Sequence, residues 1–223
     1  MLTRRSCRAY KDEPVSDDAI YNIVRAGLYA PSGMGRQSAI VVVVTDKAVR
    51  DQLSRMNAEI AGMKEGDPFY GAPVVLVVLA DRTVPTHVED GALMMGNLLN
   101  AAHAEGLGSC WIHRAREEFE SPEGKALLEK LGVKGDYVGI GHAILGVPAG
   151  APGEAPAHRE GRSVSGRAPG RAQRKTDGFQ EGPSVFCRRL AESELRLIDA
   201  APSGRTAKKS MGAEGSKEKF DEN

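Results

Sequence analysis

The sequence predicts an α+β domain in which helices flank a mixed central sheet. Two apolar runs of strand length, residues 40–44 and 73–80, are rich in β-branched residues. Between and after them, apolar residues recur every three or four positions, which is the period of a helix. Strand and helix patterns that succeed each other in this way are typical of a sheet covered by helices.

The first half of the chain contains four predicted elements. Ser16 followed by two acidic residues predicts the start of a helix that ends before Pro31. We expect Ile40–Val44 to be a strand buried on both faces, because every residue in it is apolar. Residues 47–60 return to the helical period, and residues 73–81 form a second buried strand.

The strongest helix is predicted for residues 87–105. Few charges follow Asp90, so we expect this helix to be central in the fold. Small residues at Ala92, Gly96 and Ala101 would let another helix approach it closely. The remaining elements are a strand at 109–113, a helix at 122–131 and a strand at 137–147.

The composition changes after Pro148. Residues 149–176 are rich in Ala, Gly, Pro and Arg, and residues 203–223 are polar and charged. Such segments bury too little apolar surface to offset the entropy of the chain. We therefore predict a folded domain over 1–148 and a low-complexity, mostly disordered tail over 149–223, with one short amphipathic helix possible at 185–198.

Overall composition excludes several classes of protein. The formal net charge is zero, so the whole chain has no long-range field to attract nucleic acid or a membrane surface. The apolar runs are too short to span a bilayer, and no secretory signal opens the chain. Cys7, Cys110 and Cys187 are scattered and odd in number, which predicts reduced thiols in the cytoplasm and no metal site.

A basic motif near the start is the most informative feature of the sequence. Arg4, Arg5 and Arg8 surround Ser6, and a guanidinium matches two phosphate oxygens at once. A second segment of small residues, Ala30–Gln37, would let the backbone approach a flat, bulky group. Together they suggest a phosphate-bearing cofactor, whereas the motif alone would more often be a solvated basic surface.

Five motifs in this order resemble the nitroreductase family of FMN-dependent oxidoreductases in its shorter form. They are RRSCRAY, APSGMGRQ, APVVLVVLAD, DGALMMGNLLNAAHAEGLGSCWI and GIGHAILG, and they cover nearly all of residues 3–148. The resemblance implies an α+β sandwich in which two subunits intertwine as a homodimer, with FMN at their interface.

The resemblance also implies roles for individual residues. Arg4, Arg5, Ser6 and Arg8 would hold the phosphate and ribityl chain of FMN, and Arg159 is the best candidate for the arginine that the family adds near its C-terminus. His113 and Arg114 match the place where a backbone N–H faces flavin N5. The partner subunit would line the ring with Pro31, Ser32, Gly33, Gly35 and Gln37.

The chemistry implied is hydride transfer from NADH or NADPH through flavin N5 to a small electron-poor acceptor such as a nitroaromatic or a quinone. No acid–base pair or nucleophilic triad stands out, and such a site requires no catalytic side chain. For Cys110 and Trp111 we expect packing, and for His103 and His142 the role of hydrogen-bonded core histidines.

The chain departs from the family pattern in two places. Only three residues precede Arg4, so an N-terminal helix of the family is expected to be missing, and Gln37-Ser38-Ala39 stands where the family has Gln-Pro-Trp. Two other functions stay open. One is different flavin chemistry on the same fold, such as reductive dehalogenation or enal reduction. The other, which we rank low, is nucleic-acid binding through the cationic stretch from Arg159 to Lys175.

Overall fold

Elements of the fold begin and end close to where local sequence signals predict. The computed structural model describes residues 1–162. The elements are α1 (Asp17–Leu28), a 3-10 turn (Gly33–Gly35), β1 (Ala39–Val44), α2 (Lys47–Ile60), β2 (Val74–Asp81), α3 (His87–Ala104), β3 (Gly108–Ile112), α4 (Ala115–Glu120), α5 (Pro122–Lys130) and β4 (Tyr137–Gly146). Most of the predicted tail, including its helix at 185–198 and Cys187, lies outside the described residues.

Side-chain caps explain several helix starts. The hydroxyl of Ser16 accepts a hydrogen bond from the N–H of Ala19, which confirms the predicted start of α1. Asp46 caps α2 in the same way through the N–H of Val49. Ser121 caps α5, with Pro122 at the first helical position, where a missing N–H costs nothing.

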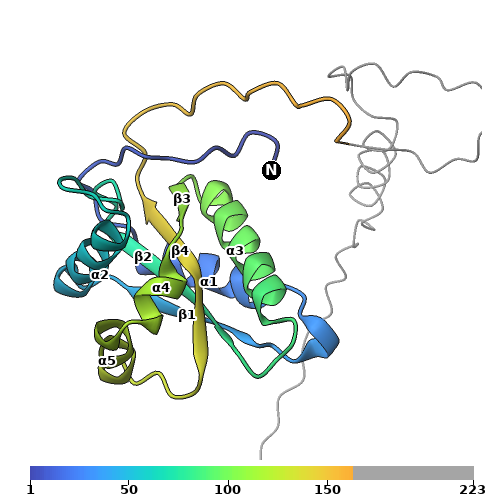
Figure 1. The fold of residues 1–223 in the computed structure, drawn as a ribbon. Helices are drawn as coiled ribbons and strands as arrows, with labels where there is room; N and C mark the ends of the chain where they lie inside the picture. Colours follow the sequence, from blue (N-terminus) through green and yellow to red (C-terminus); the bar gives the residue numbers. More distant parts are fainter. Residues whose placement is uncertain (163–223) are drawn as a thin grey trace, which may run out of the picture. The chain divides into compact units, whose positions relative to one another are not determined.

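The four strands form one sheet in the order β1-β2-β4-β3 (Figure 1). Each neighbouring pair is antiparallel, so the prediction of a mixed sheet is wrong for these strands. A parallel pairing occurs only as an isolated bridge between Ser6 and Ser109 in the described part of the chain. Strand direction depends on which strands become neighbours, and no local pattern encodes that.

Helices cover both faces of the sheet and create two apolar cores. On one face, α1 and α3 pack against alternate residues of β2 and β4, including Leu76 and Leu145. On the other face, α2, α4 and α5 cover Val75, Val77 and Ile144 (Figure 1). β2 is almost fully buried because it lies inside the sheet and both faces are covered.

Two predictions of burial are wrong for a single chain. β1 is an edge strand and Val43 is 42% exposed, whereas the sequence predicted burial on both faces. α3 buries one side and leaves Leu93 48% exposed, so it is not central. A Cβ added to Gly96 would meet no atom within 4 Å, and thus no helix of the described chain occupies that approach.

The sequence analysis missed α4. This helix is six residues long and carries mostly charged residues, so no apolar period marks it. It matters because it directly follows β3 and packs against β4, where a Cβ at Gly139 would overlap the carbonyl of Ala115. No helix within residues 1–162 is long and apolar enough to cross a membrane.

Candidate functional site

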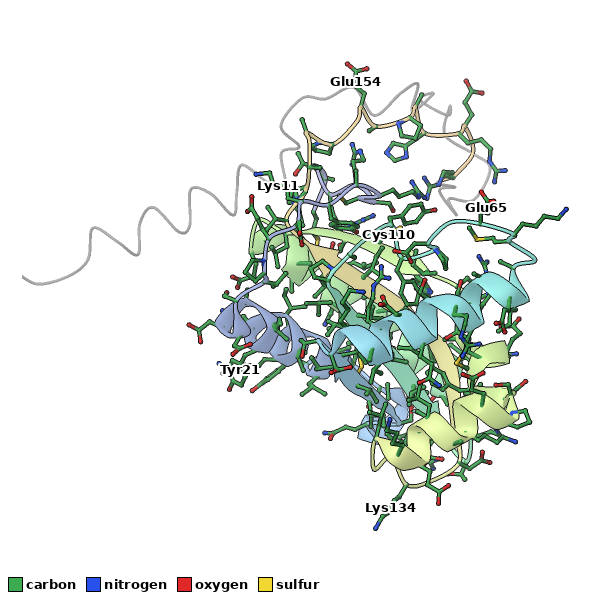
Figure 2. All side chains as sticks on the ribbon, turned by 90° about the vertical axis from the view of Figure 1, so that its left-hand side faces the viewer. Lys11, Tyr21, Glu65, Cys110, Lys134 and Glu154 are labelled. Atoms are coloured by element: carbon green, nitrogen blue, oxygen red, sulfur yellow. The ribbon has the colours of Figure 1, made fainter. Side chains whose placement is uncertain are left out.

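The basic N-terminal segment runs along the free edge of β3. Ser6 pairs with Ser109 in a parallel bridge, and the N–H of Cys7 donates to the carbonyl of Ser109 at 2.9 Å. Further along, the N–H of Lys11 donates to the carbonyl of Val147 at 2.9 Å. Lys11 and Cys110 consequently lie at the same end of the molecule, opposite Lys134 (Figure 2).

Arg4 and Arg5 are half-buried on this segment. Arg5 Nη1 donates to the carbonyls of Leu2 (2.9 Å) and Arg4 (2.7 Å). Arg4 Nη1 and Arg5 Nε are buried and have no hydrogen-bond partner. Arg8 is exposed. Two of the three predicted phosphate ligands therefore carry buried donors that nothing in the described chain satisfies.

Two more unsatisfied groups lie along β3. The hydroxyl of Ser109 is buried without a partner at the start of the strand. At its far end, Arg114 has Nε buried without a partner and adopts a left-handed backbone conformation with φ of 79°. Buried polar groups in proteins are nearly always hydrogen-bonded, so a row of exceptions on one edge indicates a polar ligand.

The predicted turn over residues 31–37 is held by the start of α3. Asp90 accepts hydrogen bonds from the N–H of Gly33 (2.9 Å) and the hydroxyl of Ser38 (2.6 Å). The hydroxyl of Ser32 accepts from the N–H of Gln37 at 3.0 Å. A Cβ on Gly33 would overlap the side chain of Thr86, so this position requires glycine.

Asp90 holds this turn as a carboxylate. Burial acts to raise its pKa, because the charged form loses water. Hydrogen bonds from Ser38, Gly33 and Thr86 outweigh burial and leave the pKa below its ordinary value. The sequence analysis noted Asp90 only because few charges follow it in the predicted helix, which begins at His87 as expected.

Strained backbone is concentrated in the predicted site segments. Among the described residues, Met34, Gln37, Tyr70 and Arg114 are the non-glycine residues with positive φ. Three of the four lie in the turn or at the end of β3. Such conformations cost about 1–3 kcal/mol each and persist where the surrounding structure imposes them, often at functional sites.

The predicted residues form two groups that one chain does not bring together. Arg4, Arg5, Ser6 and Arg114 lie along β3, whereas the turn at 31–37 precedes β1. β1 and β3 are the opposite edges of the sheet, about 14 Å apart at the normal strand spacing. Arg159 is exposed in a stretch without regular secondary structure, and Pro31 and Gly35 are exposed in the turn.

The structure refines the roles expected for other residues. Cys110 is buried, as predicted, and Trp111 lies against Gly141 but remains 38% exposed. His142 is fully buried, as predicted for a core histidine, but neither ring nitrogen makes a hydrogen bond within residues 1–162, so the expected hydrogen-bonded role is not confirmed. His103 is only half-buried, so it is not a core residue, and its Nε2 lies 2.9 Å from the hydroxyl of Thr3.

One buried polar cluster escaped the sequence analysis. Asn57, Glu118 and His142 are fully buried and lie next to one another, although the sequence separates them by 61 and 24 positions. The cluster contains the acid–histidine pair that the sequence did not reveal. The sequence gives no signal for it, because Glu118 lies between Glu117 and Glu120 in a stretch of mostly charged residues.

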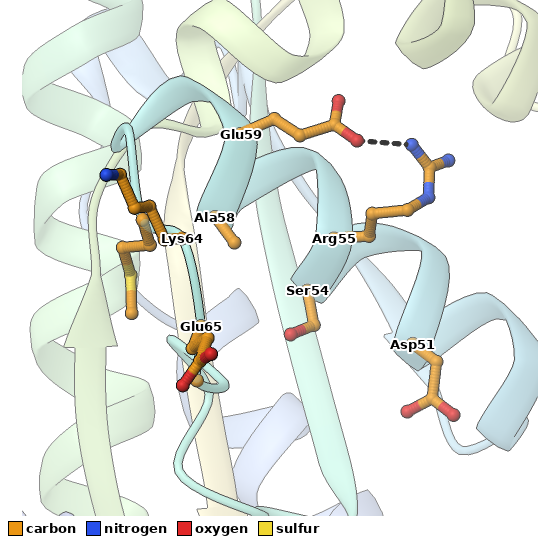
Figure 3. Close-up of a pocket in the computed structure, with 9 residues that line it drawn as sticks. Asp51, Ser54, Arg55, Ala58, Glu59, Lys64 and Glu65 are labelled. Atoms are coloured by element: carbon orange, nitrogen blue, oxygen red, sulfur yellow. Dashed lines mark hydrogen bonds and ion pairs between the residues drawn. The ribbon is translucent and has the colours of Figure 1, made fainter.

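A cavity of the described chain lies away from the predicted site residues. It has a volume of about 430 Å³ and is lined by the outer side of α2 and the loop after it, including Ser54, Arg55 and Glu65 (Figure 3). The lining ion pair between Arg55 and Glu59 measures 2.9 Å. This cavity contains none of the predicted site residues and is lined largely by exposed charged side chains, so we assign no ligand to it.

Comparison with known proteins gives consistent matches. The model of the Nitroreductase family matches residues 1–147. A protein of Archaeoglobus fulgidus, provisionally named an NADH dehydrogenase or NAD(P)H nitroreductase, is 34% identical over 153 residues, which are 66% of this chain and 83% of the relative. The FMN reductase [NAD(P)H] of Bacillus subtilis is 27% identical, over 67% of this chain and 64% of its own length.

Solved structures show the same fold. A nitroreductase with bound FMN from Bacteroides fragilis superposes with a TM-score of 0.68 at 27% identity, covering 74% of this chain and 95% of the other. Another with bound FMN, from Desulfitobacterium hafniense, has a TM-score of 0.64 at 26% identity, over 74% and 94% of the two chains.

Proposed function

The chain belongs to the nitroreductase family, and on that premise we propose that it is an FMN-dependent oxidoreductase. The electron donor is NADH or NADPH, and the acceptor is a small electron-poor molecule such as a nitroaromatic or a quinone. When bound, FMN would supply the redox chemistry, taking up a hydride from the nicotinamide and passing it to the acceptor.

The observation that carries this proposal is the row of unsatisfied donors along β3. Arg4 Nη1, Arg5 Nε and Arg114 Nε are buried without partners. Leaving a buried donor unpaired costs about 1–3 kcal/mol, and more for a charged group. A phosphate monoester presents enough acceptors for the two N-terminal guanidinium groups, so the residues present fit the phosphate of FMN.

We assign the rest of the site to the same edge. Ser6 and Arg8 extend the phosphate-binding segment, and the His113–Arg114 peptide at the end of β3 lies where the flavin ring would be. Relatives with the same fold bind FMN, which supports a flavin as the cofactor of this site. Arg159 remains a candidate for an additional phosphate contact, since it is exposed and able to reorient.

A homodimer would bring the two groups of residues to one flavin. The turn at 31–37 and the β3 edge belong to opposite edges of the sheet, and in the proposed dimer the flavin contacts the β3 edge of one chain and the turn of the other. We place the FMN-binding domain at residues 1–148 and the low-complexity tail at 149–223. The scattered cysteines suggest the cytoplasm.

Absorption spectroscopy and steady-state kinetics test the proposed function. We expect the full chain, purified and supplied with FMN, to retain a yellow flavin spectrum after gel filtration. It should then oxidise NADH or NADPH faster when menadione or a nitroaromatic is added. A correctly folded protein that stays colourless in excess FMN would contradict the proposal.

A further inference from the structure

A buried side chain of α2 contacts the backbone at the end of β3. Asn57 is fully buried, and its Nδ2 donates to the carbonyl of His113 at 2.8 Å. The same nitrogen donates its second hydrogen to Oε1 of Glu118. Both partners are acceptors, so a carboxamide nitrogen is the group that satisfies both at once.

The imidazole of His142 lies on the other side of Glu118. Nε2 of His142 lies 2.9 Å from its Oε2, and both side chains are fully buried. The rings of Phe69 and Phe119 pack around His142, with centroids 5.2 and 6.2 Å away. Burying a carboxylate in this apolar core is expensive, and apolar residues of similar volume often stabilise a fold as well or better. Stability alone is therefore a weak explanation of this cluster.

The contact from Asn57 determines the orientation of one peptide group. In a planar trans peptide the C=O and the following N–H point in opposite directions. Because the carbonyl of His113 points inward to Asn57, the N–H of Arg114 points away from α2. Pairing of β3 with β4 ends at Ile112, and the N–H of Arg114 donates no hydrogen bond within residues 1–162.

We propose that Asn57, backed by Glu118 and His142, is a positioning residue that presents the N–H of Arg114 to the bound flavin. This inference rests on the proposed function, because the FMN that we propose to bind here is the hydrogen-bond partner of the Arg114 N–H. The left-handed φ of Arg114 fits this role, because a strained backbone conformation persists where surrounding contacts impose it.

Selective isotope labelling observes this peptide directly. The chain contains two His-Arg pairs, His113-Arg114 and His158-Arg159. Carbonyl-13C histidine with 15N arginine therefore gives two correlation peaks, one from the end of β3 and one from Arg159, the candidate for an additional phosphate contact. We expect FMN to shift the Arg114 peak of the wild-type protein. In Asn57→Leu, the His113 carbonyl should shift without FMN, and the response of Arg114 to FMN should be lost.

Binding and catalysis should separate in the same variant. The arginines are unaltered in Asn57→Leu, so the Kd for FMN should stay within about twofold, while the rate of flavin reduction by the nicotinamide falls roughly tenfold. Ser54→Ala is the matched control: Ser54 is also buried on α2, but it donates to Asp67. It should leave both the peaks and the reduction rate unchanged.

Each outcome decides one question. Wild-type protein that binds no FMN contradicts the proposed function before any variant is made. Wild-type protein that binds FMN, combined with an Asn57→Leu variant whose Arg114 peak and reduction rate are those of the wild type, overturns the positioning role alone. Should Asn57→Leu fail to fold, the double variant Asn57→Leu/Glu118→Leu leaves no buried carboxylate unpaired and is subject to the same two criteria.

Discussion

Two buried polar residues of this chain make contacts that the sequence does not reveal. Asp90 and Asn57 look ordinary in the sequence, yet each is buried and contacts a strained backbone segment. Asp90 accepts hydrogen bonds from Gly33 and Ser38 of the turn, and Asn57 donates one to the carbonyl of His113, next to Arg114. Arg4 and Arg5, by contrast, could be identified from the sequence alone, because a local cluster of positive charge is unusual. Sequence patterns therefore identified the arginines proposed to bind the ligand. They missed Asp90 and Asn57, which orient the backbone of the site, because these contacts join positions far apart in the sequence.

At this scale, Asp90→Asn should destabilise the fold by about 2 kcal/mol at neutral pH, because the Gly33 and Ser38 donors then lose a charged acceptor. The pKa of Asp90 is lowered in the folded state, so its contribution is present above about pH 4, the unfolded value, and is lost as pH falls through the folded pKa. Urea unfolding from pH 7 to pH 3 measures this.

The difference between wild type and Asp90→Asn should therefore shrink as the solution becomes more acidic. Asp12→Asn, at an exposed position, is the control and should leave the free energy of unfolding unchanged at each pH. A difference for Asp90→Asn that is constant across this range would show that the carboxylate charge does not hold the turn.

Secondary-structure elements were largely predictable because their signals are local. Ser16 at α1, the apolar period of α2 and the β-branched run of β2 all placed elements within a residue or two of their observed bounds. α4 was missed because it is short and charged. The direction of the strands and the exposure of β1 were predicted wrongly, because both follow from the order β1-β2-β4-β3, which only tertiary contacts determine.

The contact between α4 and β4 gives a prediction for one element. A side chain at position 139 would overlap the carbonyl of Ala115, a backbone atom that cannot rotate away. Gly139→Ala should cost about 1–3 kcal/mol of unfolding free energy by displacing the start of α4. Gly153→Ala, where a Cβ meets nothing within 4 Å, should have little effect in the same urea titration. Equal stability of the two variants would contradict the close packing of α4.

At the scale of the whole molecule, a single chain leaves an apolar part of α3 exposed, which the proposed second copy would cover. Leu93 is 48% exposed on α3 next to the open approach at Gly96, and the two predicted groups of site residues lie on opposite edges of the sheet. Apolar side chains of this size on a helix face are typical of an interface when they occur together. These features agree with the homodimer that we propose, and the sequence anticipated the small residues of α3 but not which side they face.

Sedimentation equilibrium tests the assembly. We expect the wild-type protein to be a dimer, and Leu93→Asp to shift it towards monomer and weaken FMN binding, because a charge would be desolvated at the interface. Leu131→Asp is the control, since Leu131 is 38% exposed just after α5, on the opposite face of the sheet. A monomer that retains FMN with full affinity would refute a site shared between chains.

The most direct measurement compares the affinities of FMN and riboflavin, which differ only in the phosphate. If the N-terminal arginines bind that phosphate, wild-type protein should prefer FMN by at least about tenfold, since each charged hydrogen bond contributes about 1.5–3 kcal/mol. Arg4→Ala/Arg8→Ala should lose most of this preference while its affinity for riboflavin stays the same. Equal binding of the two flavins by the wild-type protein, or an undiminished preference for FMN in the double variant, would contradict the account.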